Sequence, residues 1–222
     1  MSLSAGASTT DPAIVPWPRT VEVRDGAMPL TAKGRILAGD ETLQPLAELL
    51  ADELFMVHGV RMGTGAGKPR PGDILLSFAR GDRSEAHTLT VGSHAEVMGA
   101  NYRAVSMGTV SLLQSVLREG EDVVLPGMSV LDRPQSSYRA LMVDVARQWH
   151  SIDTLKQHVI LCRLYKVPYL QLHLTDDQSF TFPSTADPAL PTKDRHYSVE
   201  ELKDLVTFAD RRGVTLIPEF DA

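Results

Sequence analysis

The second half of the chain alternates strand-like and helix-like segments, and this order constrains the fold more than any other feature. Strand-like runs "YRALMVDVA", "VPYLQLHLT" and "VTLIPEFD" start at residues 138, 167 and 214. The helical patterns "SIDTLKQHVILCRLYK" and "SVEELKDLVTFADRRG" lie between them. Strands that alternate with helices pair in parallel, because a crossover is needed to return to the same end of the sheet. The sequence therefore predicts a β-α-β-loop-α-β segment with parallel strands.

Both helices of this segment carry a local start signal, and the second also carries a stop signal. Ser151 and Ser198 stand where N-cap residues are favoured, and Glu201 lies three residues after Ser198, as in a capping box. Gly213 suits the end of the second helix, because glycine tolerates a left-handed backbone. These signals place the two helices between the predicted strands.

The first half of the chain, residues 14–134, mixes short strands with two helices. The helix patterns are "ETLQPLAELLADELFMVHG", which ends before Gly59, and "YRAVSMGTVSLLQSVLREG", which closes on Gly120. The expected strands are "TVEVRDG", "GRILAG" and a meander of "GDILLSFAR", "HTLTVGS" and "AEVMGA". "VVLPGMSVLDRPQSS" is interpreted as a connection. We expect a small α+β domain, an antiparallel sheet with two helices on one face.

Composition excludes several classes of protein. The 222 residues are 43% apolar and carry a formal net charge of −6, which is unsuited to nucleic acid as the main partner. No apolar run approaches the ~18 residues of a membrane span. Residues 1–13 are small and polar without the apolar centre of a signal peptide, so we expect a flexible tail. Cys162 is the single cysteine, which excludes an internal disulfide.

Acidic residues stand at the carboxyl end of each predicted parallel strand. The first strand carries Asp144, the second Asp176 and Asp177, and the third Glu219 and Asp221. Ligands of parallel α/β folds gather at these ends, so the set predicts an active site; the alternative is that the acids cap helices or solvate loops.

The loop after the second strand, residues 175–198, is far longer than the typical two to six residues. Its aromatic residues Phe180, Phe182 and Tyr197 suit the wall of a sugar site, or alternatively form a small core of the loop itself.

A metal or nucleotide site is not expected. Asp176 and Asp177 are adjacent, and neighbouring residues of an extended strand point to opposite sides, so they converge poorly with His173 on one ion. No glycine-rich phosphate loop follows a strand. We therefore predict neither a metal nor a cofactor.

The stretches "YRALMVDVARQWHSIDTLKQHV", "LHLTDDQSF" and "VTLIPEFDA" resemble glycoside hydrolase family 20, the β-N-acetylhexosaminidases. Ala140 and Gln148 depart from the glycine and histidine usual at those positions. The resemblance implies that residues 14–134 form the small domain that precedes the barrel. It also implies that residues 135–222 form the first three β/α units of a (β/α)8 TIM barrel, which is incomplete.

The resemblance further implies a glycosidase that removes terminal N-acetylhexosamine residues from glycans by substrate-assisted, retaining catalysis. The substrate's acetamido oxygen is the nucleophile, and an Asp-Glu pair after the fourth strand assists it. That pair is expected beyond Ala222, so the chain alone is expected to be inactive. The parent enzyme is expected to be secreted or periplasmic.

Residue roles follow from the same resemblance. Arg139 matches the arginine that binds the ring hydroxyls, a task suited to a rigid guanidinium. Asp176 matches the acid that tunes the catalytic glutamate through a histidine beyond Ala222. Strict alternation would place Asp177 on the face of His173, so we expect alternation to break where the strand ends. Residues expected to shape the site are His173, Asp177, Asp144, Glu219 and Asp221.

Two alternatives stay open at this point. One is a non-catalytic carbohydrate-binding or interaction module. The other is an unrelated barrel hydrolase with a metal at His173. An Asp-Glu pair encoded beyond Ala222 would favour the glycosidase over the binding module.

Overall fold

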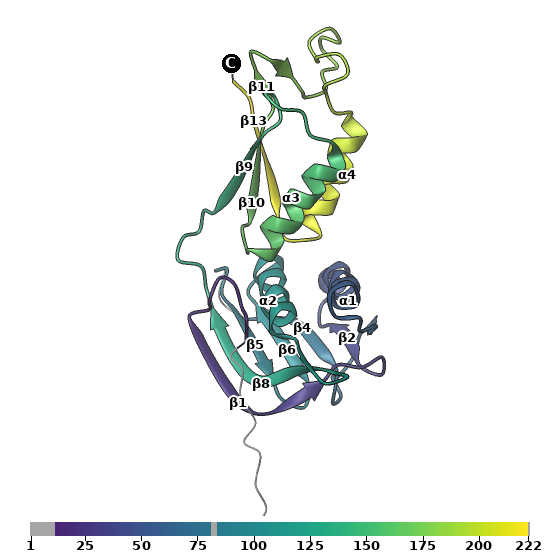
Figure 1. The fold of residues 1–222 in the computed structure, drawn as a ribbon, viewed down its shortest axis with the longest axis vertical. Helices are drawn as coiled ribbons and strands as arrows, with labels where there is room; N and C mark the ends of the chain where they lie inside the picture. The colour runs from purple at the N-terminus through teal and green to yellow at the C-terminus, as the bar shows by residue number, and fades with distance from the viewer. Residues whose placement is uncertain (1–11, 81–83, 222) are drawn as a thin grey trace, which may run out of the picture. The chain divides into compact units, whose positions relative to one another are not determined.

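A computed structural model describes residues 12–80 and 84–221, and the chain divides into two compact units, Met1–Arg133 and Pro134–Ala222. Residues 1–11 of the predicted flexible tail 1–13 lie outside the described residues. Within the described ranges, every helix is too short or too polar to cross a membrane. A sheet-rich domain is followed by a partial barrel-like region (Figure 1).

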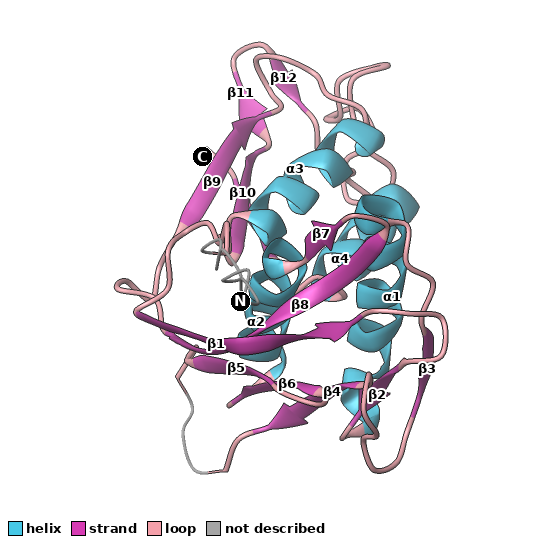
Figure 2. Ribbon diagram, turned by 60° about the horizontal axis from the view of Figure 1, so that its bottom comes forward, coloured by secondary structure: helices cyan, strands magenta, loops and turns pink. Residues whose placement is uncertain are grey.

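Unit 1 is built on one eight-stranded sheet with the order β1-β8-β5-β6-β4-β2-β3, and β7 pairs with β8 off this path. Helices α1 (Gln44–His58) and α2 (Tyr102–Ser115) pack on one face of the sheet (Figure 2), and a 3-10 turn, Glu41–Leu43, precedes α1. The strands are β1 Thr20–Pro29, β2 Arg35–Ala38, β3 Gly63–Gly65, β4 Ile74–Phe78, β5 His87–Val91, β6 Ala95–Gly99, β7 Leu117–Glu119 and β8 Asp122–Asp132.

The prediction of a purely antiparallel sheet with a meander was wrong. Strand β4 pairs in parallel with β6, and β2 pairs in parallel with both β3 and β4. Helix α1 lies between β2 and β4 in the chain, and such a crossover returns the chain to the same end of the sheet. A tight turn, closed by the Gly92 N–H donating to the His94 carbonyl at 3.0 Å, pairs β5 with β6. Strand β4 therefore lies at the other edge of β6.

The interpretation of residues 123–137 as a connection was wrong for residues 123–132, because β8 is a long strand between β1 and β5, and holds for residues 133–137, which lie outside helices and strands. Pro126 and Gly127 of this strand face a bulge in β1 between Val23 and Ala27. A proline without an N–H is tolerated at such an irregularity. A side chain at Gly127 would lie 3.0 Å from backbone oxygens of that bulge.

Both helices of unit 1 form within the segments whose apolar spacing predicted them. Helix α1 ends before Gly59, whose φ of 76° is easy for glycine, as predicted. Helix α2 ends at Ser115, not at Gly120, which instead turns the chain between β7 and β8 with φ 64°.

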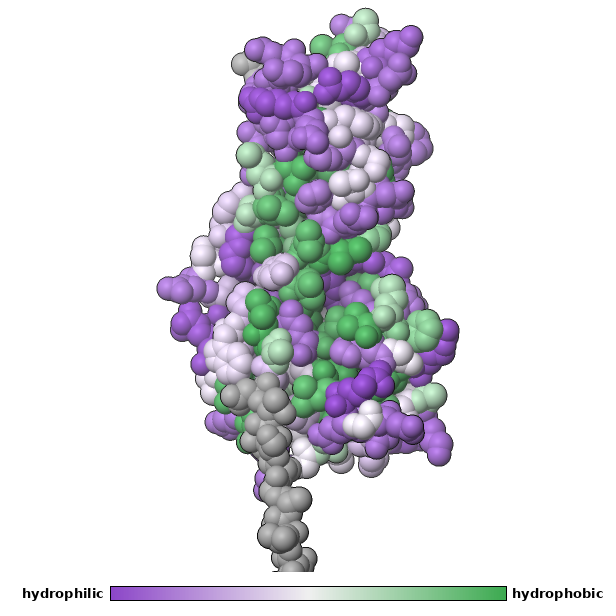
Figure 3. Space-filling model, in the orientation of Figure 1, coloured by the Kyte–Doolittle hydropathy of each residue, from purple (hydrophilic) through white to green (hydrophobic). Residues whose placement is uncertain are grey.

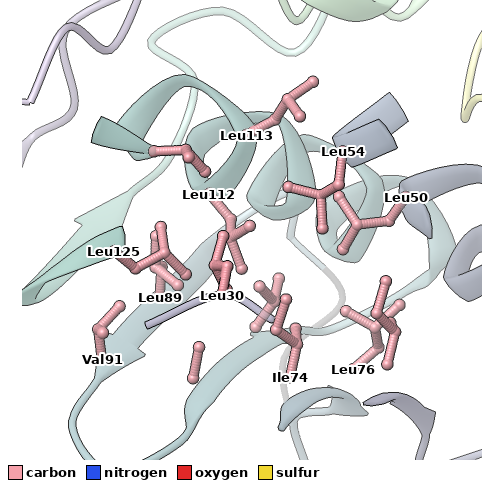
Figure 4. Packing of buried hydrophobic residues seen from close by; sticks show 14 of the residues in the cluster. Leu30, Leu50, Leu54, Ile74, Leu76, Leu89, Val91, Leu112, Leu113 and Leu125 are labelled. Atoms are coloured by element: carbon pink, nitrogen blue, oxygen red, sulfur yellow. The ribbon is translucent and has the colours of Figure 1, made fainter. Parts of the chain in front are cut away.

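The core of unit 1 lies between the two helices and the sheet. Leu50 and Leu54 of α1 and Leu112 of α2 are fully buried against strand residues such as Ile74 and Leu89 (Figure 4). The leucines of α1 recur at helical spacing, so they form one apolar face. Burial of this face is what places α1 on the sheet.

Unit 2 has the predicted β-α-β-loop-α-β order and a parallel three-stranded sheet, β13-β10-β9. Ser151 and Ser198 cap the helices as predicted, and Ser198 forms the complete capping box with Glu201. A hairpin of two antiparallel strands, each with two residues, follows β10. The elements are β9 Ala140–Asp144, α3 Ile152–Leu164, β10 Tyr169–His173, β11 Thr175–Asp176, β12 Ser179–Phe180, α4 Val199–Asp210 and β13 Thr215–Glu219.

One face of this parallel sheet forms a core with the helices. Leu170 and Leu172 of β10 pack with Leu155 of α3 and Leu205 of α4, and all four are almost fully buried. Side chains alternate along a strand, so Gln171 and His173 point to the opposite face. That face is the one on which the strand-end acids can meet.

Substituting Gly34 tests the close approach of two turns in unit 1. In Gly34→Ala the new methyl group would lie well inside van der Waals contact with the Gly72 carbonyl oxygen and 2.8 Å from the end of Met62. We expect the free energy of unfolding to fall by about 1–3 kcal/mol, because the backbone has to move. Equilibrium urea unfolding measures this.

Gly63→Ala is the matched control, since a methyl group there meets nothing within 4 Å. We expect its stability to stay within about 0.5 kcal/mol of the wild type. Equal unfolding midpoints for the two variants would contradict the packing of these turns.

Candidate functional site

The ends of the three parallel strands meet in register. His173, the last residue of β10, pairs with Asp144 of β9 on one side and with Glu219 of β13 on the other. Residues paired in register point to the same face of a parallel sheet. Three chemically active side chains, far apart in the sequence, therefore lie side by side. The end of unit 2 that carries β11 is mainly hydrophilic in the view of Figure 3.

His173 is the centre of this cluster. Its side chain is 8% exposed; Nε2 lies 3.2 Å from Asp176 Oδ2 and Nδ1 lies 3.4 Å from Glu219 Oε1. The hydrogen bond with Asp176 raises the pKa of His173; burial opposes the shift, and Glu219 and Asp144 add to it. The histidine is thereby biased toward its charged form, in which both ring nitrogens donate.

The carboxylate nearest to His173 belongs to Asp176 and not to Asp177. Strand β10 ends at His173, and the chain turns into the β11–β12 hairpin, which breaks the alternation as predicted. Asp176 Oδ1 accepts from the Asp177 N–H at 2.7 Å, while Asp177 itself is exposed. The bond to His173 and the Asp177 N–H lower the pKa of Asp176, so it stays ionised.

Arg147 belongs to the cluster, although the sequence reasoning did not single it out. Its Nη1 lies 2.6 Å from Asp144 Oδ2, and its Nη2 pairs with Asp176 Oδ2. Burial would raise the pKa of Asp144, but hydrogen bonds from the Arg147 backbone and side chain more than offset this and lower it. The available signal was a basic residue three positions after a strand-end acid.

Gln171 was the second residue missed. Its Nε2 donates to Glu219 Oε2 at 2.6 Å, and it shares the sheet face with His173. Its alternation with His173 along "LQLHL" was the signal in the sequence. Glu219 is thus held by two neighbours from β10.

Asp221 lies at the edge of the cluster. Its backbone N–H donates to Thr175 Oγ1 at 2.8 Å, and its Oδ2 is 3.9 Å from His173 Nε2. Together with Glu219 and His173 it offers three ligand atoms within 4.8 Å of one another. Exposed carboxylates commonly gather without an ion, so this geometry by itself does not support a metal centre.

Arg139 lies away from these acids. It precedes β9, and its guanidinium donates to the Ser136 carbonyl at 2.5 Å and to the Lys166 carbonyl at 3.2 Å. Asp144 is five residues further along, about 17 Å at ~3.3 Å per residue. The structure therefore does not bring Arg139 together with the carboxylate cluster.

The long loop after β10 packs on the loop after β9. Tyr197 is fully buried, its ring stacks on Trp149 at 4.3 Å, and its hydroxyl donates to the His150 carbonyl at 2.8 Å. Ser179 Oγ donates to the Ala146 carbonyl at 2.6 Å. Tyr197 therefore belongs to the main core of unit 2, and forms neither a wall of a sugar site nor a separate core of the loop.

Two further aromatic residues of the loop lie beside Phe220, which follows β13. The ring of Phe182 meets Phe220 edge-on at 5.1 Å, and Phe180 lies 6.4 Å from it. Phe220 is 44% exposed, so an apolar ring borders the polar cluster. Such a combination suits a ligand with both apolar faces and hydroxyls.

Two family models match the chain. The model described as "Glycosyl hydrolase family 20, domain 2" matches residues 11–133, and the model described as "Glycosyl hydrolase family 20, catalytic domain" matches residues 137–222. Together they cover almost all of the sequence.

Curated relatives and solved structures match over nearly the whole chain. It is 30% identical over 229 residues to the "Beta-N-acetylhexosaminidase" of Cellulomonas fimi, which covers 95% of this chain and 46% of that protein. The "Beta-hexosaminidase" of Porphyromonas gingivalis is 26% identical over 231 residues, 94% of this chain and 30% of that protein. The fold is similar to that of the N-acetyl-beta-hexosaminidase of Streptomyces plicatus in complex with Thio-NAglucal, with a TM-score of 0.85 and 23% identity. The match covers 95% of this chain and 46% of that chain. The chain thus spans less than half the length of these proteins.

Asp176→Asn tests the electrostatics of the cluster. The substitution replaces the carboxylate whose hydrogen bond raises the pKa of His173 by a neutral amide of the same shape. We expect His173 to titrate above its ordinary value of about 6.5 in the wild type and at a lower pH in the variant. An NMR pH titration of the imidazole signals measures both.

Asp177→Asn is the matched control, because it neutralises the neighbouring acid, whose side chain is exposed. The titration midpoint of His173 in this variant should stay close to that in the wild type. The same fall in both variants would assign the effect to general charge at this end of the sheet and contradict a specific role for Asp176.

Proposed function

Because the chain belongs to glycosyl hydrolase family 20, we propose that it supplies the small domain and the first three β/α units of the (β/α)8 barrel of a β-N-acetylhexosaminidase. In this proposal residues 14–134 are the small domain and residues 135–222 are the start of the barrel. The substrate is a glycan with a terminal N-acetylhexosamine residue, which the enzyme hydrolyses. The observation that carries the proposal is the histidine and carboxylate cluster at the carboxyl ends of adjacent parallel strands.

The chemistry proposed is substrate-assisted hydrolysis with retention. The acetamido oxygen of the substrate attacks the anomeric carbon, and an enzyme carboxylic acid protonates the leaving oxygen. An Asp-Glu pair performs the enzyme's share, and residues 134–222 contain no Asp directly followed by Glu. We propose that the pair follows a fourth strand beyond Ala222.

Asp176 has a supporting role in this proposal. An ionised carboxylate can hold and polarise a histidine that in turn contacts the catalytic acid. His173 and the Asp177 N–H lower the pKa of Asp176 further below the ordinary aspartate value, so it stays ionised well into the acidic range. His173, Asp144, Glu219 and Asp221 shape the pocket around it, and Asp177 contributes through its backbone.

Arg139 is proposed to bind ring hydroxyls of the terminal sugar. A guanidinium presents parallel donors that match two neighbouring hydroxyl groups. The role requires its side chain to leave the Ser136 and Lys166 carbonyls and turn to the sheet face that carries Gln171. Family resemblance supports this role, and the contacts described above do not.

The coding sequence after Ala222 and a hydrolysis assay test the function. We expect an Asp-Glu pair to be encoded beyond Ala222, and we expect a protein that includes it to release the chromophore from a chromogenic N-acetylglucosaminide. Residues 1–222 alone should show no turnover at enzyme rates, because general acid catalysis supplies about 10²–10⁴ in rate. A stop codon at that point, with glycan binding retained, would instead support a non-catalytic module.

Arg139→Ala tests the sugar contact in the active protein. We expect kcat/KM to fall by the equivalent of about 2–4 kcal/mol, since substrate hydroxyls would be left unpaired in the transition state. Arg24→Ala, which removes an exposed arginine of unit 1, is the control and should leave kcat/KM within about twofold. A fall in kcat/KM of less than about threefold in Arg139→Ala would contradict a role for Arg139 in binding the sugar.

A further inference from the structure

Arg147 joins carboxylates that belong to two different strand ends. Asp144 closes β9, and Asp176 lies in the hairpin that follows β10. One guanidinium contacts both, through Nη1 to Asp144 Oδ2 at 2.6 Å and through Nη2 to Asp176 Oδ2. A planar guanidinium with fixed donor directions sets the distance between its two partners, which a single ammonium cannot do.

The same oxygen of Asp176 faces both Arg147 and His173. Oδ2 pairs with Arg147 Nη2 and lies 3.2 Å from His173 Nε2, while Oδ1 accepts from the Asp177 N–H. Donors from three directions therefore orient this carboxylate. The Arg147 contact is the one that links it to the neighbouring strand.

Repulsion among the carboxylates of the cluster explains why a cation between Asp144 and Asp176 matters. Four carboxylates, those of Asp144, Asp176, Glu219 and Asp221, surround His173 or its neighbours. Like charges at such separations repel, and the acids would lower their repulsion by turning away or by taking up a proton. A cation between Asp144 and Asp176 removes this repulsion at the point where it would move Asp176.

The backbone that carries Arg147 is itself held in place. Its N–H donates to Asp144 Oδ1 at 2.9 Å, and the adjacent Ala146 carbonyl accepts from Ser179 Oγ at 2.6 Å and from Arg195 Nη2 at 3.2 Å. The side chain is 57% exposed, so ion pairing alone would contribute little to stability. Its value lies in geometry, because a fixed backbone presents the guanidinium in one place.

We infer that Arg147 is a positioning residue that bridges the ends of β9 and β10 and keeps the Asp176 carboxylate turned toward His173. The importance of this for catalysis rests on the proposed function, in which Asp176 supports the catalytic acid. The contacts themselves are features of the chain as it stands.

Two possible roles of Arg147 predict opposite effects on His173. If Arg147 were only a nearby positive charge, its removal would ease the protonation of His173 and raise the titration midpoint. If it positions Asp176, its removal lets that carboxylate turn away, and the midpoint falls toward the ordinary histidine value. The direction of the change therefore separates positioning from simple charge repulsion.

The experiment is an NMR pH titration of His173 in residues 1–222 carrying Arg147→Met. We expect the midpoint to fall, in the same direction as in Asp176→Asn. Arg147→Lys keeps the charge but loses the fork, so its midpoint should lie between those of the wild type and Arg147→Met. A midpoint that rises or does not change in Arg147→Met would overturn the inference.

Lys156→Met is the matched control, because it removes an ion pair of the same unit, Lys156 with Asp204, that does not touch the cluster. Its midpoint should equal that of the wild type, and an equal fall there would also overturn the inference. If circular dichroism shows that Arg147→Met does not fold, Arg147→Lys decides: a lowered midpoint supports positioning and an unchanged one contradicts it.

The titration is independent of the proposed function, since it needs neither substrate nor turnover. A protein that hydrolyses no N-acetylhexosaminide but shows the expected fall would refute the function and leave the positioning role intact. An active enzyme in which the midpoint does not fall would refute the positioning role and leave the proposed function intact.

Discussion

Parallel pairing in register is the constraint on which the candidate site depends. Asp144, His173 and Glu219 are separated by dozens of residues in the chain, and they become neighbours because β9, β10 and β13 pair without offset. A shift of one residue would turn His173 into the helix-covered core and bring Leu172 to the polar face. The apolar alternation of β10, which buries Leu170 and Leu172 under α3 and α4, fixes the register. Core packing and the site are therefore two faces of one sheet.

The electrostatics of the cluster follow from this arrangement. A nearly buried histidine loses hydration, which favours its neutral form, yet carboxylates on three sides favour the charged form and prevail. Arg147 and backbone N–H groups lower the pKa of Asp144, and His173 and the Asp177 N–H lower the pKa of Asp176. His173, Asp144 and Asp176 are thus stabilised in their charged states by neighbours that the strand ends bring to them. Such mutual dependence makes the geometry sensitive to the loss of one member.

Local signals in the sequence predicted three helix ends correctly, although Gly120, which was expected to close α2, instead turns the chain between β7 and β8. The caps at Ser151 and Ser198 and the end of α1 at Gly59 were predicted, because capping depends on residues within one helical turn. The β-α-β order of unit 2 was predicted because apolar period and length separate its strands from its helices. Strand β8 was missed because Pro126 and Gly127 have the composition of a turn. Only the bulge in β1, more than a hundred positions away in the chain, makes that pair compatible with a central strand.

By itself the sequence determined the alternation of unit 2, the acids at its strand ends and the family to which the motifs belong. Periodicity, caps and motif spacing are properties of neighbouring residues, so they can be read without coordinates. The tertiary structure alone decided that β4 runs parallel to β6, that Gln171 holds Glu219, and that Arg147 spans two strand ends. Strand order and side-chain contacts depend on which distant segments pack together. That choice is made by burial and charge over the whole unit, and no local pattern contains it.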